Sequence, residues 1–275
     1  MLPAVSVVIP SCGRPVLLAR CLAALERQSL PRSRFEVIVS DDSVERSGPA
    51  AARNRGWRRA LAPIVAFTDD DTEPEPGWLE AALAAFDDPG LDAVAGRIVM
   101  PIGDIPTDYE RDASGLERAE FVTANCLVRK EVLERLGGFD EDFRMAWRED
   151  SDLHFRLLAA GCRIARVPHA VVVHPVRPAP WGVSLGQQKK VMFDALLFRK
   201  HRALYRSRIR ARPRWDYYAI VGCLAAGAFV PVFLVGWAAL TGGFVARRLR
   251  GASKAPRHVL EMLVTSVAIP PLALF

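Results

Sequence analysis

Apolar runs alternate with helical stretches along the first part of the chain. Residues 5–9 form a continuous β-branched run, typical of a strand buried on both faces, and Pro15 suits the first turn of the helix that follows. Further strands are predicted at residues 35–40, 63–68 and 91–100, and helices at residues 15–28, 50–61 and 78–86. The alternation predicts an α/β fold in which βαβ units build a mostly parallel sheet flanked by helices.

The pattern becomes less regular after residue 100. Residues 103–118 are polar and contain Gly and Pro, which predicts a surface loop. Strands are predicted at residues 121–128, 163–167 and 171–173, and helices ending in glycine at residues 130–136 and 149–160. Residues 187–205 are amphipathic with a basic face, as in a helix that lies on an anionic leaflet.

The C-terminal part has the composition of a membrane segment. No charged residue occurs between Tyr217 and Ala246, a stretch long enough to cross the hydrocarbon core of a bilayer. Pro231 lies within it and is as compatible with a kinked or re-entrant hairpin as with a straight span. Residues 259–275 form a second candidate membrane helix. Basic residues flank the charge-free stretch on both sides, so the positive-inside rule selects no orientation.

The net charge of the chain also changes near the start of the C-terminal part. Residues 1–198 carry 24 Lys and Arg against 29 Asp and Glu, whereas residues 199–275 carry 13 against 2. The basic character therefore belongs to the tail, and a nucleic-acid-binding function loses most of its support. We expect a catalytic domain at residues 1–200, followed by a basic juxtamembrane segment with one or two membrane helices at residues 201–275.

Two further observations concern the compartment. The five cysteines show no CxxC spacing, so we expect neither a disulfide framework nor a zinc site, and a reducing compartment fits. The start of the chain lacks the basic and apolar regions of a signal peptide. We expect a membrane-associated protein whose catalytic domain lies on the cytoplasmic side.

An acidic triplet follows the third predicted strand. Asp69 and Asp71 are one residue apart, and their carboxylates could share Mg²⁺ or Mn²⁺, cations that prefer oxygen ligands. Acidic residues also favour turns and helix starts for purely structural reasons, so the triplet alone leaves both interpretations open.

Two more polar segments could carry chemistry. Glu149, Asp150 and Asp152 begin a predicted helix, where capping explains one acid but does not require three. Arg53 follows a run of small residues on another predicted helix and could meet phosphate with both guanidinium nitrogens. A helix with a solvated basic face explains Arg53 equally well.

Seven motifs occur in order: Val5-Ser6-Val7-Val8-Ile9-Pro10, Asp41-Asp42-Ser43, Ala52-Arg53-Asn54, Asp69-x-Asp71, Pro76-Gly77-Trp78-Leu79, Gly137-Gly138-Phe139-Asp140 and Glu149-Asp150-x-Asp152-Leu153. Together they resemble the inverting family 2 glycosyltransferases of the GT-A fold, over about residues 4–175. Asp41-Asp42-Ser43 lacks the glycine that relatives usually place before the serine.

The resemblance implies a role for each matching position. The nucleotide-sugar site would comprise Pro10, Ser11, Arg14, Asp41, Arg53 and Asp70. The metal site for Mg²⁺ or Mn²⁺ would comprise Asp69 and Asp71, with His174 near the metal or the diphosphate, although a lone histidine beside a proline is also commonly structural. The catalytic pair would be Asp150, as the base, and Glu149 beside it.

The same resemblance implies the reaction. A sugar would pass from a nucleotide-diphosphate sugar, with UDP or dTDP expected ahead of GDP, to an acceptor hydroxyl with inversion. Membrane lipids are expected partners, and a lipid-linked glycan is a candidate acceptor.

Three alternatives remain at this stage. One is a non-catalytic membrane scaffold with the same fold. Another is a haloacid-dehalogenase-like phosphatase with Asp69 as nucleophile, although that motif normally follows a first strand. The last is a sugar-nucleotide pyrophosphorylase, whose longer glycine-rich loop this chain lacks.

Overall fold

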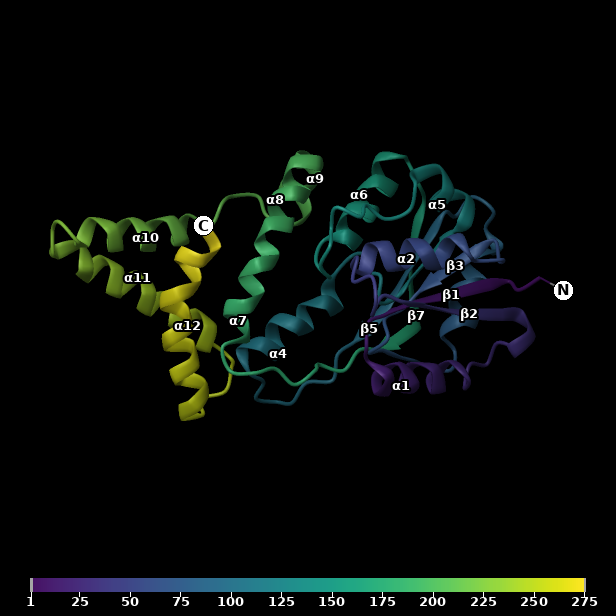
Figure 1. The fold of residues 1–275 in the computed structure, drawn as a ribbon, viewed down its shortest axis with the longest axis horizontal. Helices are drawn as coiled ribbons and strands as arrows, with labels where there is room; N and C mark the ends of the chain where they lie inside the picture. The colour runs from purple at the N-terminus through teal and green to yellow at the C-terminus, as the bar shows by residue number, and fades with distance from the viewer. Residues whose placement is uncertain (1, 275) are drawn as a thin grey trace. The chain divides into compact units, whose positions relative to one another are not determined.

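The computed structural model describes residues 2–274, which form two compact units (Figure 1). Met1 and Phe275, the ends of the two expected domains, lie outside the described residues. The first unit contains the chain up to Pro101 together with Leu116–Pro175, and the second contains Ile102–Gly115 and the chain from Val176 onwards. The functional division expected at residue 200 stays a prediction.

The described part of the first unit is built on a seven-stranded sheet. Its strands, in the spatial order β2-β1-β3-β6-β5-β7-β4, are β1 Val5–Ser11, β2 Phe35–Asp41, β3 Ile64–Phe67, β4 Glu73–Pro74, β5 Ala93–Val99, β6 Cys126–Arg129 and β7 Ile164–Val173. The pairings of β1 with β2 and β3, and of β5 with β7, are parallel, whereas β4 and β6 pair antiparallel with their neighbours. The α/β class is confirmed, and the sheet is mixed because β6 returns beside β5 without a crossover helix on the sheet.

Helices of the first unit fall close to their predicted positions. They are α1 Pro15–Leu25, α2 Pro49–Arg58, α3 Trp78–Ala84, α5 Lys130–Leu136 and α6 Glu149–Ala159, with single 3-10 turns at Arg32–Arg34 and Ala85–Asp87. Helix α2 lies directly on β1, because a Cβ atom at Gly56 would approach Val8 to 2.3 Å. Helix α5 ends at Gly137, which takes the left-handed conformation at φ 77°. The core between α2, α6 and the sheet includes Phe67 and Leu153.

Three sequence-based expectations were wrong in detail. The expected loop at residues 103–118 contains helix α4 (Asp108–Ala113) and a 3-10 turn (Ser114–Arg118), because Thr107 and Glu110 form a capping box. The strand expected from residue 121 begins only at Cys126, after a turn closed by the Asn125 amide. The two strands expected at residues 163–173 are one strand, β7, with an irregular register opposite β5.

The second unit is helical in its described part. Besides α4 it contains α7 Val183–Gly186, α8 Val191–Lys200, α9 Arg202–Arg208, α10 Trp215–Gly227, α11 Val232–Leu249 and α12 Pro256–Leu274. The expected amphipathic helix is interrupted at His201, whose backbone is not helical. The charge-free stretch breaks before Pro231, so of the two shapes left open the helical hairpin forms, with α10 and α11 side by side (Figure 1).

Among the described residues, α11 and α12 are long and apolar enough to cross a membrane, by length and composition.

Candidate functional site

One edge of the sheet collects most of the residues singled out above. Ser11 and Asp41 are paired at the carboxyl ends of β1 and β2, and the acidic triplet follows β3. His174 follows β7, which runs in the same direction as β3. Strand β7 is parallel to β5, and two antiparallel pairings through β6 make β5 parallel to β3. Parallel strands thus deliver all these side chains to the edge where ligands of open α/β sheets bind.

Two threonines that we did not predict fix the turn after β3. The hydroxyl of Thr72 donates to the carbonyl of Asp69 at 2.7 Å, and the hydroxyl of Thr68 donates to the carbonyl of Ala124 at 3.0 Å. The two hydroxyl oxygens lie 2.7 Å apart, and both threonines are fully buried. Their signal in the sequence was the placement of small polar residues on either side of the triplet at the end of an apolar strand.

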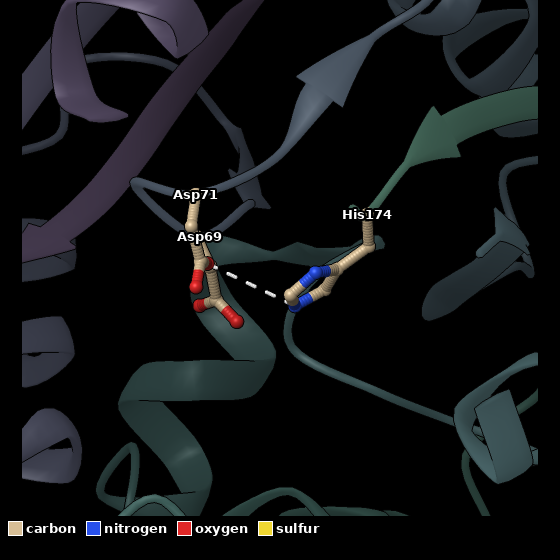
Figure 2. Close-up of side chains that lie close together, drawn as sticks. All are labelled: Asp69, Asp71 and His174. Atoms are coloured by element: carbon tan, nitrogen blue, oxygen red, sulfur yellow. Dashed lines mark ion pairs between the residues drawn. The ribbon is translucent and has the colours of Figure 1, made fainter. Parts of the chain in front are cut away.

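Asp69, Asp71 and His174 point toward one another (Figure 2). One ligand atom from each lies within 4.8 Å of the others, and the His174 Nε2 atom is 3.8 Å from an Asp71 carboxylate oxygen. The Nδ1 atom of His174 is buried without a hydrogen-bond partner. Two carboxylates and an imidazole with an unsatisfied nitrogen fit a divalent cation such as Mn²⁺.

Asp70 faces other protein groups. Its buried carboxylate accepts hydrogen bonds from the Ser11 hydroxyl at 2.8 Å and from the Arg14 Nε atom at 3.0 Å. Burial raises the pKa of this carboxyl, against the effect of these two donors. The guanidinium of Arg14 also lies 3.6 Å from Asp71. Asp70 therefore holds the loop after β1 against the triplet, and its expected contact with the nucleotide remains untested.

Arg53 links the two acidic segments. Its guanidinium is buried and lies 2.6 Å from a carboxylate oxygen of Asp69 and 3.0 Å from one of Glu149. Burial opposes the ionisation of Asp69, but the adjacent Arg53 outweighs it and holds the pKa of that carboxyl below its usual range. Asp69 and Glu149, which are 16 and 96 residues from Arg53 in the sequence, thus share its guanidinium group. The triplet and the start of α6 therefore form a single site.

The expected catalytic acids occupy the first turn of α6. Burial raises the pKa of Glu149 to about 7, although Arg53 acts in the opposite direction, and burial also raises the pKa of Asp150. The carboxylate of Asp150 accepts from the backbone N–H of Ser151 at 2.6 Å. A carboxylate with a raised pKa is a stronger base than an ordinary one, as proton abstraction from a hydroxyl requires.

The backbone before these acids is strained. Arg148 has φ 75°, a left-handed conformation that a residue with a side chain rarely adopts and that costs about 1–3 kcal/mol. Its guanidinium lies over the ring of Trp147, 4.7 Å from the centroid. Such strain is common where the chain must aim a functional side chain.

The loop after β2 distinguishes its two aspartates. Asp41 is exposed, and hydrogen bonds from Ser43 lower the pKa of its carboxyl. Asp42 is buried and accepts from the Gly48 N–H at 2.8 Å and from Arg55 at 2.6 Å. Asp42 is therefore structural, whereas Asp41 is open to solvent, and its expected contact with the nucleotide stays a prediction.

Two buried asparagines hold together the segments that carry the site. The side chain of Asn54 donates to the carbonyl of Phe139 and accepts from the Phe139 N–H, both at 2.8 Å, which ties α2 to the segment leading to α6. Asn125, which we did not single out, accepts from the Trp78 indole N–H at 2.8 Å and donates to β5 and β7 carbonyls. A lone asparagine before a short strand carried no recognisable signal.

Known proteins are similar to this chain in sequence and in fold. The family described as "Glycosyl transferase family 2" matches residues 43–146. Glycosyltransferase AglE of Haloferax volcanii is 27% identical, over 74% of this chain and 79% of that protein. Pre-mycofactocin glycosyltransferase of Mycobacterium tuberculosis is 38% identical over 47% of this chain, which spans only 30% of that relative's length.

A solved structure is similar over the whole chain. Mannosyltransferase PcManGT from Pyrobaculum calidifontis, in complex with GDP-Man and Mn²⁺, has a TM-score of 0.59 and 20% identity, covering 100% of this chain and 86% of that one. A similarity with 20% identity establishes the fold of this chain, whereas GDP-Man and Mn²⁺ are ligands of PcManGT. With the family match, the relatives and the fold in agreement, the chain is a glycosyltransferase of the GT-A fold that is similar to glycosyl transferase family 2 over residues 43–146.

Proposed function

We propose that this glycosyltransferase moves a sugar from a nucleotide-diphosphate sugar to an acceptor hydroxyl, with inversion at the anomeric carbon. The observation that carries the proposal is the shared contact of Arg53 with Asp69 and Glu149, which joins the donor-side and acceptor-side acids. Separate surface acids would not need a buried arginine between them, because an exposed carboxylate is already stabilised by water.

The donor would lie along the carboxyl edge of the sheet. Pro10, Ser11 and Asp41 end β1 and β2 at the place where a base and ribose would rest, and Arg14 reaches the triplet from the loop after β1. Asp69, Asp71 and His174 would hold a divalent cation, which supplies positive charge to neutralise the departing diphosphate. The Mn²⁺ in PcManGT supports Mn²⁺ as the first cation to test, and its GDP-Man supports testing GDP-sugars beside the UDP- and dTDP-sugars that the sequence ranked ahead of them.

The acceptor would be activated by Asp150. Its carboxylate would remove the proton of the acceptor hydroxyl as that oxygen attacks C1 of the sugar from the face opposite the diphosphate. A single in-line displacement of this kind inverts the anomeric centre without a covalent intermediate. Glu149 would hold Arg53 and keep the start of α6 oriented toward Asp69.

We place the protein at a membrane, with the first unit on the cytoplasmic side and residues 201–275 as the attachment. The lengths and compositions of α11 and α12 support the attachment. A glycan or lipid-linked glycan fits as acceptor, since a membrane-held enzyme meets such molecules at the bilayer surface.

The alternatives differ in what they predict. The match to a sugar-transferring family over residues 43–146 does not support a phosphatase or a pyrophosphorylase. A non-catalytic scaffold would keep the fold and yet bind no donor, so donor binding is the property to measure.

The test is a binding and hydrolysis screen of UDP-, dTDP- and GDP-sugars with Mn²⁺ or Mg²⁺ on the detergent-solubilised full chain. Asp71→Ala should weaken metal-dependent donor binding by more than roughly tenfold, because it removes one of three metal ligands. The matched control is Asp87→Ala, which removes an exposed acid elsewhere on the same unit and should leave binding unchanged. Equal binding by both variants, or no binding of any donor, would refute the donor site.

A further inference from the structure

The α10–α11 hairpin is a closely packed pair of helices. A Cβ atom at Gly227 would approach the side chain of Leu234 to 2.4 Å, and one at Gly236 would lie 3.5 Å from the Cys223 sulfur. Small residues thus let the two arms touch, as in helix pairs that pack in a lipid environment. The two helices therefore form one packed element that can insert into a lipid bilayer as a unit.

Helix α10 is too short to cross a bilayer, and α11 reaches the length of a span only when its last turn, with Arg247 and Arg248, is included. Helix α10 has 13 residues, a length of about 20 Å, and the charge-free part of α11, residues 232–246, is about 22 Å long. The hydrocarbon core of a typical bilayer is about 30 Å thick. The 13 residues of α10 suit a re-entrant or interfacial segment better than a span.

The two ends of the hairpin differ sharply in chemistry. At the tip, Phe229 is 87% exposed and Val235 is 70% exposed. At the base, Asp216 pairs with Arg214 at 3.2 Å and with Arg247 at 2.9 Å, which brings the start of α10 and the end of α11 together. Both arms therefore carry their charged ends at the same level, and the exposed large apolar side chains are concentrated at the tip, with fewer along the arms, such as Leu224 and Leu240.

Helix α12 also has a polar group where a spanning helix would be deepest. Thr265 lies near its midpoint, is fully buried, and accepts a hydrogen bond from Arg248 at 2.6 Å. The buried Arg248 also pairs with Asp108 of the short charged helix α4 at 2.8 Å. If α12 crossed the membrane, this ion pair would lie near the bilayer midplane, where charges are strongly disfavoured.

From these observations we infer that the second unit enters one leaflet and returns, so that the chain does not cross the membrane. The inserted part is the tip of the hairpin, residues 227–236, and the partner is a bilayer with an anionic surface. Charge complementarity supports that partner, because exposed basic residues flank both arms. They include Arg206, Arg210, Arg212, Arg250, Lys254 and Arg257.

This inference rests on the membrane attachment proposed above, and its test uses location, independently of sugar transfer. Phe229→Cys and Lys254→Cys are made in the full chain, and sealed membrane vesicles of both orientations are treated with a membrane-impermeant maleimide. Native Cys12, exposed on the first unit, reports the face on which that unit lies. Peptide mass spectrometry then separates the labelled positions, and donor binding is measured on the same vesicles.

The expected pattern is specific to a re-entrant hairpin. The thiol introduced by Lys254→Cys is labelled in the same orientation as Cys12, and the thiol introduced by Phe229→Cys is protected in both orientations until detergent is added. Labelling of the Lys254→Cys thiol from the face opposite Cys12 would mean that α11 crosses. Labelling of the Phe229→Cys thiol from that opposite face would mean that the whole hairpin crosses. Either result overturns the inference while leaving the donor site intact.

A matched pair of charge substitutions tests the depth of the tip. Phe229→Asp should weaken cosedimentation with vesicles containing anionic lipid by roughly tenfold or more, because a carboxylate replaces a large apolar side chain in lipid. Leu61→Asp places the same charge on an exposed apolar position of the first unit, 63% exposed, and should leave cosedimentation unchanged. Equal effects of the two substitutions, or recovery of the unmodified protein in the soluble fraction, would overturn the insertion of the tip.

Discussion

Replacement of Arg53 by methionine tests the link between the two acidic segments. Methionine keeps most of the length and apolar stem of the arginine, but it leaves the carboxylates of Asp69 and Glu149 without their shared cation. Removal of one partner from a buried ion pair costs about 3–5 kcal/mol. A domain of ordinary stability has about 5–15 kcal/mol in total, so the variant should remain folded but with a large part of its stability lost.

The loss should depend on pH because one of the two acids can escape by taking up a proton. The pKa of Glu149 is raised from 4.5 to about 7. For such a group the stabilising contribution is complete below pH 4.5 and is lost as the pH rises through 7. Arg53 partly offsets that loss, so its removal raises the pKa of Glu149 further. The cost of Arg53→Met should therefore be larger at pH 8 than at pH 5, by about 1.4 kcal/mol for each unit of that further rise.

The assay is urea unfolding of the detergent-solubilised full chain at both pH values, followed by tryptophan fluorescence. Arg58→Met is the control on the same helix, since Arg58 is half-exposed and lies 3.8 Å from Glu141. A surface pair of this kind contributes no more than about 1 kcal/mol. The reasoning is refuted if the two variants lose equal stability, or if the loss for Arg53→Met is the same at pH 5 and pH 8.

Other predictions concern the base, the metal ligand and the turn before α6. Asp150→Asn should lower kcat by roughly 10²–10⁴-fold with donor binding unchanged, and the wild-type rate should fall on acidification at a pH above the ordinary aspartate range, because burial raises the pKa of Asp150; a pH–rate profile with no acid limb would contradict this. His174→Gln should weaken Mn²⁺ binding by roughly tenfold in a direct metal titration, and unchanged affinity would remove the histidine from the site. Gly138→Ala should cost more than about 2 kcal/mol in thermal unfolding, because φ is 73° and the new Cβ would lie 2.4 Å from the Asn54 side chain, whereas Gly137→Ala, with φ 77° and open space, should cost about 1 kcal/mol.

Most of the first unit could be predicted from the sequence because its signals are local. Apolar runs predicted β1, β2 and β3, and the acids that follow β2 and β3 predicted the edge at which Asp41 and Asp69 lie. The resemblance placed His174 near the metal, and in the structure its ring does lie beside Asp71. The expected roles of these residues await the experiments above.

The missed features depend on contacts between distant segments or on weak local signals. Arg53 is 96 residues from Glu149, and no spacing rule connects a helix basic face with the first turn of another helix. Asn125 satisfies carbonyls of two strands that are recognisable as neighbours only after the sheet is assembled. Helix α4, by contrast, had a recognisable signal in Thr107-x-x-Glu110, which was outweighed by the glycines and prolines around it.

The pairing of Asp108 with Arg248 has a consequence for synthesis on the ribosome. The two residues are 140 positions apart, so at about 5–20 residues per second Asp108 emerges on the order of ten seconds before its partner. The strands that complete the sheet of the first unit are made during that interval, since β7 ends at Val173. The nascent sheet can therefore close before the last helices are made, and the segment Ile102–Gly115 stays exposed to solvent during that interval.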